Sequence, residues 1–347
     1  SCRGERSRGC RSAESRHGPG RGTAPLRTGR GYIAAPPEAV GVSADDDSPQ
    51  APGGTTGGVP DERATGDDPL QLSTVDVAFL VFVPAVLVGV FLLPMGLRRE
   101  LALRYTEPSL RTMYAAHFVH FDFPHLVANL LVYLLVVPFS LAVSAWSGRR
   151  RRFYVVAVTI FLAFPLLLSG LNVLFPRPQI GVGFSGLNLA FVGYLPHVLA
   201  DRFEAKHPEW ERSRAALLAL AFFVGTGIIT ARVAMSIRGV TRTGLWMLLA
   251  AGAGSVVTAA WLLRPVVSRL RAHGATGGTI PPLVTLGGLL FVILMIVSFP
   301  EVSATGRSVV DIFLHLLGFS FGYLIPYTAF QVLGLSVGNG PLNGSPP

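Results

Sequence analysis

Long apolar stretches alternate with short polar connections along the chain from about residue 77 onward. Eight of these stretches are candidate membrane helices, taking about 20 residues for one crossing. They are residues 77–96, 124–146, 153–175, 185–200, 215–236, 243–263, 282–300 and 309–330. The run 185–200 is the shortest, since its sixteen residues cover only about 24 Å of a core roughly 30 Å thick. We expect an all-α polytopic membrane protein in which one end of that helix lies below the membrane surface.

The first 72 residues lack any such pattern. They are rich in Arg, Gly and Ser at first and in Asp, Gly, Pro and Thr later, a composition that buries too little apolar surface to offset chain entropy. We expect a disordered polar region at 1–72, a membrane domain at 73–331 and a short flexible tail at 332–347. The sequence begins with Ser and its first Met is Met95, so part of the N-terminal region is expected to be artefactual.

Composition supports the membrane assignment. Hydrophobic residues make up 50% of the chain and charged residues 14%, whereas soluble domains carry about 25% charged residues. The net charge of +9 does not indicate nucleic-acid binding, because the basic residues beyond the N-terminal region flank the apolar runs instead of forming one patch. Both cysteines, Cys2 and Cys10, precede the membrane domain, so no disulfide framework or cysteine-based metal site is expected within it.

The arginines predict an orientation, since short cytoplasmic loops are enriched in basic residues. The loops that follow the second, fourth and sixth runs are the more basic ones and lie on one side of the membrane. Only the first loop, with Arg98 and Arg99 among its arginines, argues the other way. We therefore expect a multi-pass protein of a cell membrane with a cytoplasmic N-terminus and Ser185 toward the external side.

The first chemical motif is Gly181-Val182-Gly183-Phe184-Ser185-Gly186 at the start of the shortest run. Glycines at 183 and 186 permit a tight turn and close helix approach. A serine at a helix start lies beside backbone N–H groups that have no partner within the helix, and these can form an oxyanion hole. The alternative is a serine that only caps an ordinary membrane helix.

The second motif contains His120, His125 and Asn129 around the start of the second run. His125 and Asn129 are four residues apart and share a helical face, while His120 precedes Pro124, which suits the first turn of a helix. Imidazole and carboxamide groups are good donors to a developing oxyanion. The alternatives are interfacial histidines with a structural asparagine, or a metal site that also uses His117 and Asp122.

The third motif is His315, Gly318 and Gly322 on the last run. Offsets of three and seven residues place them on one stripe, and glycines four apart permit close helix approach. Gly186 and Gly193 offer a matching face on the run 185–200. Since the fourth and eighth runs point in the same direction, Ser185 and His315 can meet at one depth. The alternative is a structural histidine in a helix contact.

Together, the patterns HxxxxHxxxN, GxSG and HxxGxxxG in this order resemble the rhomboid family of intramembrane serine proteases over residues 77–330. The resemblance implies that Ser185 is the nucleophile and His315 the general base and then the general acid. It further implies that His120, Asn129 and the Ser185 N–H stabilise the oxyanion, with His125 in support. It implies membrane-anchored protein substrates cleaved near the external face and no cofactor, and it leaves the oligomeric state open.

Two departures from the family pattern stand out. The six-span family core is expected to carry two extra spans here, residues 243–263 and one neighbour, between the serine and the histidine. Many relatives also have an aromatic ring four residues after the serine, where this chain has Leu189. Asp311, one turn before His315, is expected to be a solvated carboxylate rather than a third catalytic group. The alternatives to a protease are a catalytically silent rhomboid-like adaptor that binds transmembrane segments and a solute transporter.

Overall fold

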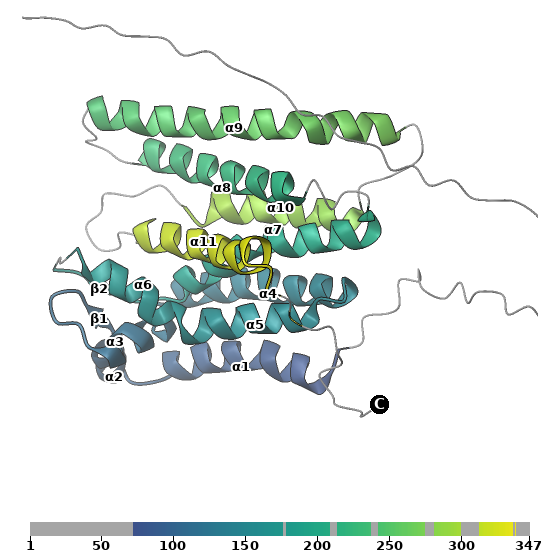
Figure 1. The fold of residues 1–347 in the computed structure, drawn as a ribbon. Helices are drawn as coiled ribbons and strands as arrows, with labels where there is room; N and C mark the ends of the chain where they lie inside the picture. Colours follow the sequence, from purple (N-terminus) through teal and green to yellow (C-terminus); the bar gives the residue numbers. More distant parts are fainter. Residues whose placement is uncertain are drawn as a thin grey trace, which may run out of the picture. The chain divides into compact units, whose positions relative to one another are not determined.

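The computed structural model describes residues 72–175, 178–208, 214–236, 242–274, 281–299, 312–335 and 337. This part of the chain is all-α apart from one two-stranded ribbon, with most of the long helices running along a common direction (Figure 1). Its α-helices are α1 (Thr74–Phe91), α2 (Met95–Leu101), α3 (Leu110–Ala115), α4 (Phe123–Trp146), α5 (Arg150–Leu162), α6 (Phe164–Val173), α7 (Ser185–Lys206), α8 (Arg214–Ser236), α9 (Arg242–Gly274), α10 (Pro282–Val297) and α11 (Ile312–Tyr327). The remaining elements are a 3-10 turn η1 (Ala116–Phe118), a π-helical turn η3 (Thr328–Val332), and strands β1 (Leu103–Arg104) and β2 (Ile180–Gly181).

Each of the eight expected runs contains a helix. Five helices of the described residues, α1, α4, α8, α9 and α11, are long and apolar enough to cross a bilayer. The pair α5 and α6, bent by 41° at Ala163, makes a sixth if it counts as one span. The structure thus confirms a helical membrane protein with five or six candidate spans, fewer than the eight expected. α10 is too short for this class at sixteen residues, and α7 carries charged residues along its last two turns.

The helix that begins at Ser185 is longer than the sequence analysis predicts. α7 has 22 residues and ends at Lys206 rather than at residue 200, which corresponds to about 33 Å. Its charged end continues the helix because Asp201 pairs with Arg152 at 2.8 Å and with Arg214. The helix thus extends beyond the apolar run through a charged segment and is not among the candidate spans, so the depth of Ser185 must be argued from helix contacts.

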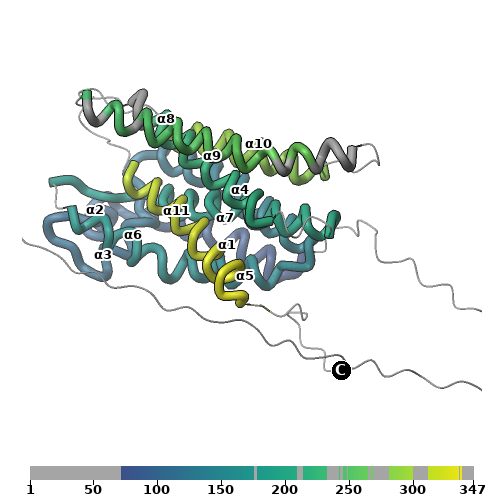
Figure 2. Tube along the Cα trace, turned by 45° about the horizontal axis from the view of Figure 1, so that its top comes forward, coloured from purple at the N-terminus to yellow at the C-terminus, as the bar shows by residue number. Residues whose placement is uncertain are grey.

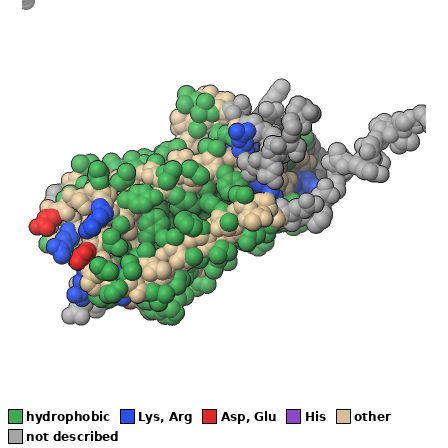
Figure 3. Space-filling model, turned by 90° about the horizontal axis from the view of Figure 1, so that it is seen from below, with side chains coloured by type: hydrophobic (Ala, Val, Ile, Leu, Met, Phe, Trp, Pro, Cys, Tyr) green, Lys and Arg blue, Asp and Glu red, His purple; other side chains and the backbone are tan. Residues whose placement is uncertain are grey.

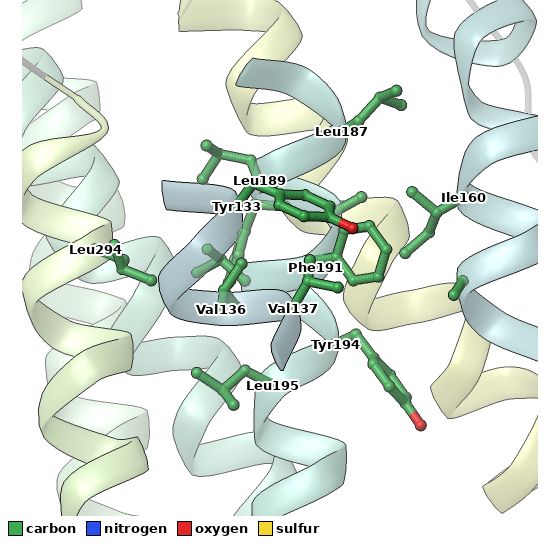
Figure 4. Close-up of a cluster of buried hydrophobic side chains, with 14 of the residues drawn as sticks. Tyr133, Val136, Val137, Ile160, Leu187, Leu189, Phe191, Tyr194, Leu195 and Leu294 are labelled. Carbon is green, nitrogen blue, oxygen red and sulfur yellow. The ribbon is translucent and has the colours of Figure 1, made fainter. Parts of the chain in front are cut away.

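α7 lies at the centre of the helix packing. It contacts α4, α5, α6, α8, α10 and α11, and every residue from Gly186 to Phe203 is buried. Figure 2 shows α11 passing beside it. Figure 4 shows how side chains of α7 such as Phe191 and Leu195 meet those of α4, α5 and α10, including Val136, Ile160 and Leu294. A helix buried on all sides provides a rigid support for a residue at its first position.

The outer surface carries an apolar band. Leu, Val and Phe side chains that are more than 40% exposed lie on α1, α4 and α5, among them Phe82, Leu134 and Val158. Figure 3 shows such side chains across the middle of one face, with lysine and arginine side chains toward its ends. An exposed apolar surface of this extent is the expected property of helices that face lipid.

The helices α8 and α9 pack along each other, and α8 also contacts α7, α10 and α11. They follow one another between the serine-bearing α7 and the histidine-bearing α11. The run 243–263, expected to be one of two extra spans, lies in α9. α10 instead packs against both α4 and α7.

Candidate active site

The loop before α7 is held in place by backbone contacts. Gly181 pairs with Leu103 in the β1–β2 ribbon, and the Gly183 N–H donates to the Ala116 carbonyl at 3.0 Å. Gly183 has a φ of +116°, and a Cβ at this position would lie 2.6 Å from His125 Cε1. Glycine is therefore required here for both conformation and space. Ser185 follows this turn directly, and the His125 ring packs against Gly183 within the turn.

Ser185 is the first residue of α7 and is half-buried. The first bonds of the helix are donated by the Leu187 and Asn188 N–H groups, both to the Phe184 carbonyl at 3.0 Å. The Ser185 and Gly186 amides come earlier in the turn, where a helix supplies no carbonyl partner of its own. These two N–H groups lie next to the serine hydroxyl and at the positive end of the helix dipole, so they can stabilise a developing negative charge.

His315 on α11 is only 6% exposed. Its Nδ1 lies 2.9 Å from the Ser298 carbonyl oxygen at the end of α10. Since a carbonyl only accepts, Nδ1 carries the proton, and the lone pair of the neutral ring resides on Nε2. The Phe299 ring packs edge-on against the imidazole, with centroids 5.7 Å apart and planes at 88°. The end of α10 therefore fixes both the tautomer and the orientation of His315.

Glycines bring α7 and α11 into backbone contact. A Cβ on Gly318 would clash with the Gly186 carbonyl, 3.1 Å from its carbon, and a Cβ on Gly322 would lie 2.5 Å from Ala190 Cα. A Cβ on Gly193 would lie 2.9 Å from the Tyr323 nitrogen. These pairs advance together along both helices, so α7 and α11 are parallel. The predicted contact between the glycine stripes is confirmed.

The same contact joins the neighbours of the serine and the histidine. Gly186 follows Ser185, Leu314 precedes His315, and a Cβ on Gly186 would lie 3.1 Å from Leu314 Cγ. Gly318, one turn after His315, also packs on Gly186. The structure thus places the segments that carry Ser185 and His315 beside each other, as the sequence analysis predicts from the direction of their helices.

The three residues of the second motif occupy different surroundings. His120 is completely buried, and its Nε2 accepts a long bond of 3.5 Å from the Phe184 N–H. Burial, together with the nearby His125, lowers the pKa of His120 to about 4, so its ring is neutral near pH 7. His125 is only half-buried, with its ring 5.0 Å from that of His120 and against Gly183. Thus His120 contacts the loop from the protein interior, whereas the half-buried His125 contacts it where the surface is less covered.

Asn129 connects this cluster to α7. Its Nδ2 donates to the His125 carbonyl at 3.0 Å, and its backbone carbonyl and Oδ1 accept from Asn188 Nδ2 at 2.9 and 3.2 Å. Asn188 is buried one turn after Ser185, and the sequence analysis did not identify it. Its offset of three from the serine is the signal that would have placed it on the same helical face.

A second serine and histidine lie together, but their hydrogen bonds argue against catalysis. His117 Nε2 is 3.0 Å from Ser169 Oγ and 3.1 Å from the Pro165 carbonyl, while Ser169 donates its proton to the Met113 carbonyl at 2.7 Å. The hydroxyl proton therefore goes to a carbonyl and not to the imidazole. Both side chains are buried, so their hydrogen bonds fasten η1 and the end of α3 to α6.

The metal-site alternative, Asp311 and Leu189 complete the features named from the sequence. Within the described ranges, no three His, Cys, Asp or Glu side chains are grouped so that they can hold a metal ion. Asp311 lies outside the described residues. Leu189, where relatives often have an aromatic ring, is buried in the core at 1% exposure. Phe299 supplies an aromatic contact to His315 from a different helix end.

Comparison of the chain with models of protein families, with curated proteins and with solved structures finds no match. The assignment of a function therefore depends on the residues and the geometry described above.

Proposed function

We propose that this chain is an intramembrane serine endopeptidase of the rhomboid type, with Ser185 as the nucleophile and His315 as the base. The observation that carries the proposal is the contact between the start of α7 and the His315 segment of α11, in which Gly186 packs on Leu314 and Gly318. Polar side chains among apolar helices are costly and are usually retained for function. This contact gathers a serine, a buried histidine and helix-start N–H groups.

The chemistry follows from the hydrogen bond of His315. With Nδ1–H held by the Ser298 carbonyl, Nε2 accepts the proton of Ser185 as Oγ attacks the carbonyl carbon of the scissile peptide. The C–N bond of the tetrahedral intermediate then breaks, and the imidazolium returns its proton to the leaving amine. Water attacks the resulting acyl-serine, again with His315 as the base. This releases the acid product and restores the serine.

The oxyanion donors in this proposal are the first-turn amides of α7, Asn129 and one of the two histidines. The geometry favours His125 for this role over His120, because His125 lies on the open side of the Gly183 turn. His120 instead accepts from Phe184 while it is buried behind that turn. The roles implied by the family resemblance are thus exchanged between the two histidines.

The proposed substrates are membrane-anchored proteins. A membrane-embedded serine is accessible to chains anchored in the same bilayer, and a helix must unwind before its peptide bond can be attacked. We propose substrates whose transmembrane helices carry small or helix-destabilising residues near their outer end. The active site would face the external side of a cell membrane, with the N-terminus of the chain in the cytoplasm.

The test is cleavage of a membrane-anchored reporter in proteoliposomes that contain the purified full-length protein. Wild type should cleave the reporter, and Ser185→Ala and His315→Ala should each abolish cleavage. Ser169→Ala is the matched control, because Ser169 is the other serine next to a histidine, and this variant should retain cleavage. Unchanged cleavage by His315→Ala would assign the base elsewhere. Binding of the reporter without cleavage by wild type would instead favour the silent adaptor.

A further inference from the structure

An apolar groove lies between α5 and α11, away from Ser185. It has an empty volume of about 360 Å³ and is lined from α5 by Val155, Val156 and Thr159, and from the end of α11 by Gly322 and Ile325 among others. The rim is open, since Val155 is 45% and Ile325 37% exposed. The groove therefore opens on the apolar outer surface of the helices.

Arginines lie at one end of this groove. Arg149 precedes α5 and Arg150 to Arg152 begin it. The Arg152 guanidinium lies 4.5 Å above the ring of Phe330, which lines the groove. Arg152 is neutralised by Asp201 at 2.8 Å. Arg151 is exposed and forms no ion pair with any residue in the described ranges. Because Arg151 and Val155 are four residues apart, the unpaired charge and the groove share one face of α5.

The length of the groove matches one leaflet. On this side the lining extends from Val155 on α5 to Phe164, the first residue of α6 after the bend at Ala163, which is roughly 13 Å along the two helices. Half of a hydrocarbon core of roughly 30 Å is about 15 Å. The arginines therefore lie where lipid headgroups begin, and the apolar lining continues toward the bilayer centre.

We propose that this groove binds an anionic phospholipid of the leaflet in which α5 begins. The phosphate binds to Arg151, and one acyl chain lies along Val155, Thr159 and Ile325. The combination of a basic end and an apolar channel of one-leaflet length distinguishes this ligand from a neutral lipid and from a free anion. A basic residue beside the membrane surface attracts anionic lipid, whereas the groove holds the chain.

The test is native mass spectrometry of the full-length protein in detergent with dioleoyl phosphatidylglycerol, dioleoyl phosphatidylcholine or glycerol phosphate. Wild type should bind phosphatidylglycerol more tightly than phosphatidylcholine and should not retain glycerol phosphate. Arg151→Gln should weaken phosphatidylglycerol binding about fivefold. Val155→Trp, which fills the groove, should abolish phosphatidylglycerol binding. Arg99→Gln, an exposed arginine on α2, is the matched control and should bind as wild type does.

Several results would overturn the site. Equal affinity for the two phospholipids would show that charge plays no part, and retention of glycerol phosphate would indicate a site for soluble anions. Wild-type binding by Arg151→Gln or by Val155→Trp would place the lipid elsewhere. Equal weakening by Arg99→Gln and Arg151→Gln would mean that overall positive charge, and not this groove, attracts the lipid. None of these measurements requires proteolytic activity.

Discussion

Replacing Gly322 by alanine adds a single methyl group to the contact between α7 and α11. That methyl carbon would lie 2.5 Å from Ala190 Cα and 2.6 Å from the Ala190 carbonyl carbon, whereas carbon atoms pack at about 3.5 Å or more. The obstacle is backbone, which no side-chain rotation relieves. The two helices must therefore separate by about 1 Å. Since Gly322 is two turns beyond His315, this separation moves the histidine relative to Ser185.

A displacement of this size has a large expected effect on catalysis. Misplacement of reacting groups by about 1 Å costs on the order of a hundredfold in rate, and overpacking a core costs about 1–3 kcal/mol of stability. Gly322→Ala should therefore lower kcat/KM for reporter cleavage by about two orders of magnitude. The assay is reporter cleavage in proteoliposomes, well below the temperature at which the variant unfolds.

The matched control is Gly288→Ala on α10, because a Cβ at Gly288 meets nothing within 4 Å. It makes the same chemical change in an apolar helix and should leave the rate within about twofold, as expected for substitutions away from packed contacts. Near-wild-type cleavage by a folded Gly322→Ala would refute the reasoning, since the close approach of α7 and α11 would then not set the position of the dyad. Equal losses in both variants would refute it as well.

Three further predictions concern the surroundings of the site. Arg98→Gln removes a 2.8 Å bond to the His120 carbonyl and should lower the free energy of unfolding by about 1.5–3 kcal/mol, measured by denaturant titration in detergent. The pKa of His120 is about 4 when folded against an ordinary 6.5. On acidification the unfolded chain therefore takes up this proton first, and His120 should contribute about 2 kcal/mol to the fall in the free energy of unfolding between pH 7.5 and 5. His120→Gln should make the dependence of this free energy on pH shallower by that amount. Asp201→Asn leaves Arg152 and Arg214 without their shared carboxylate and should lower the free energy of unfolding by about 3 kcal/mol, measured in the same titration. A decrease below about 1 kcal/mol would show that these ion pairs do not stabilise the fold.

Features encoded by local spacing could be predicted from the sequence. The apolar runs identify the helices, and the offsets of Gly318 and Gly322 from His315 identify the face that packs on α7. Small residues at helical spacing permit backbone contact wherever a matching face exists. Gly186 and Gly193 provided that face in the sequence, so the parallel contact of the two helices was predictable without coordinates.

Features that depend on tertiary partners could not be predicted. α7 continues through Asp201 because arginines from α5 and α8 neutralise it, and no local pattern announces those pairs. Ser298 and Phe299 orient His315 although they lie sixteen or more residues earlier in the chain. The intervening sequence does not indicate that these residues come close to His315 in space. The number of candidate spans differed because α10 has only sixteen residues and α7 carries charged residues along its last two turns.

The central claim is that Ser185 is an activated nucleophile, and covalent labelling tests it most directly. Purified wild-type protein in detergent is treated with a fluorophosphonate probe beside Ser185→Ala and His315→Ala, with Ser169→Ala as the control for the second serine–histidine pair. The account predicts strong labelling of wild type and of Ser169→Ala, and loss of labelling in the other two variants. Wild type that labels no better than Ser185→Ala would contradict it.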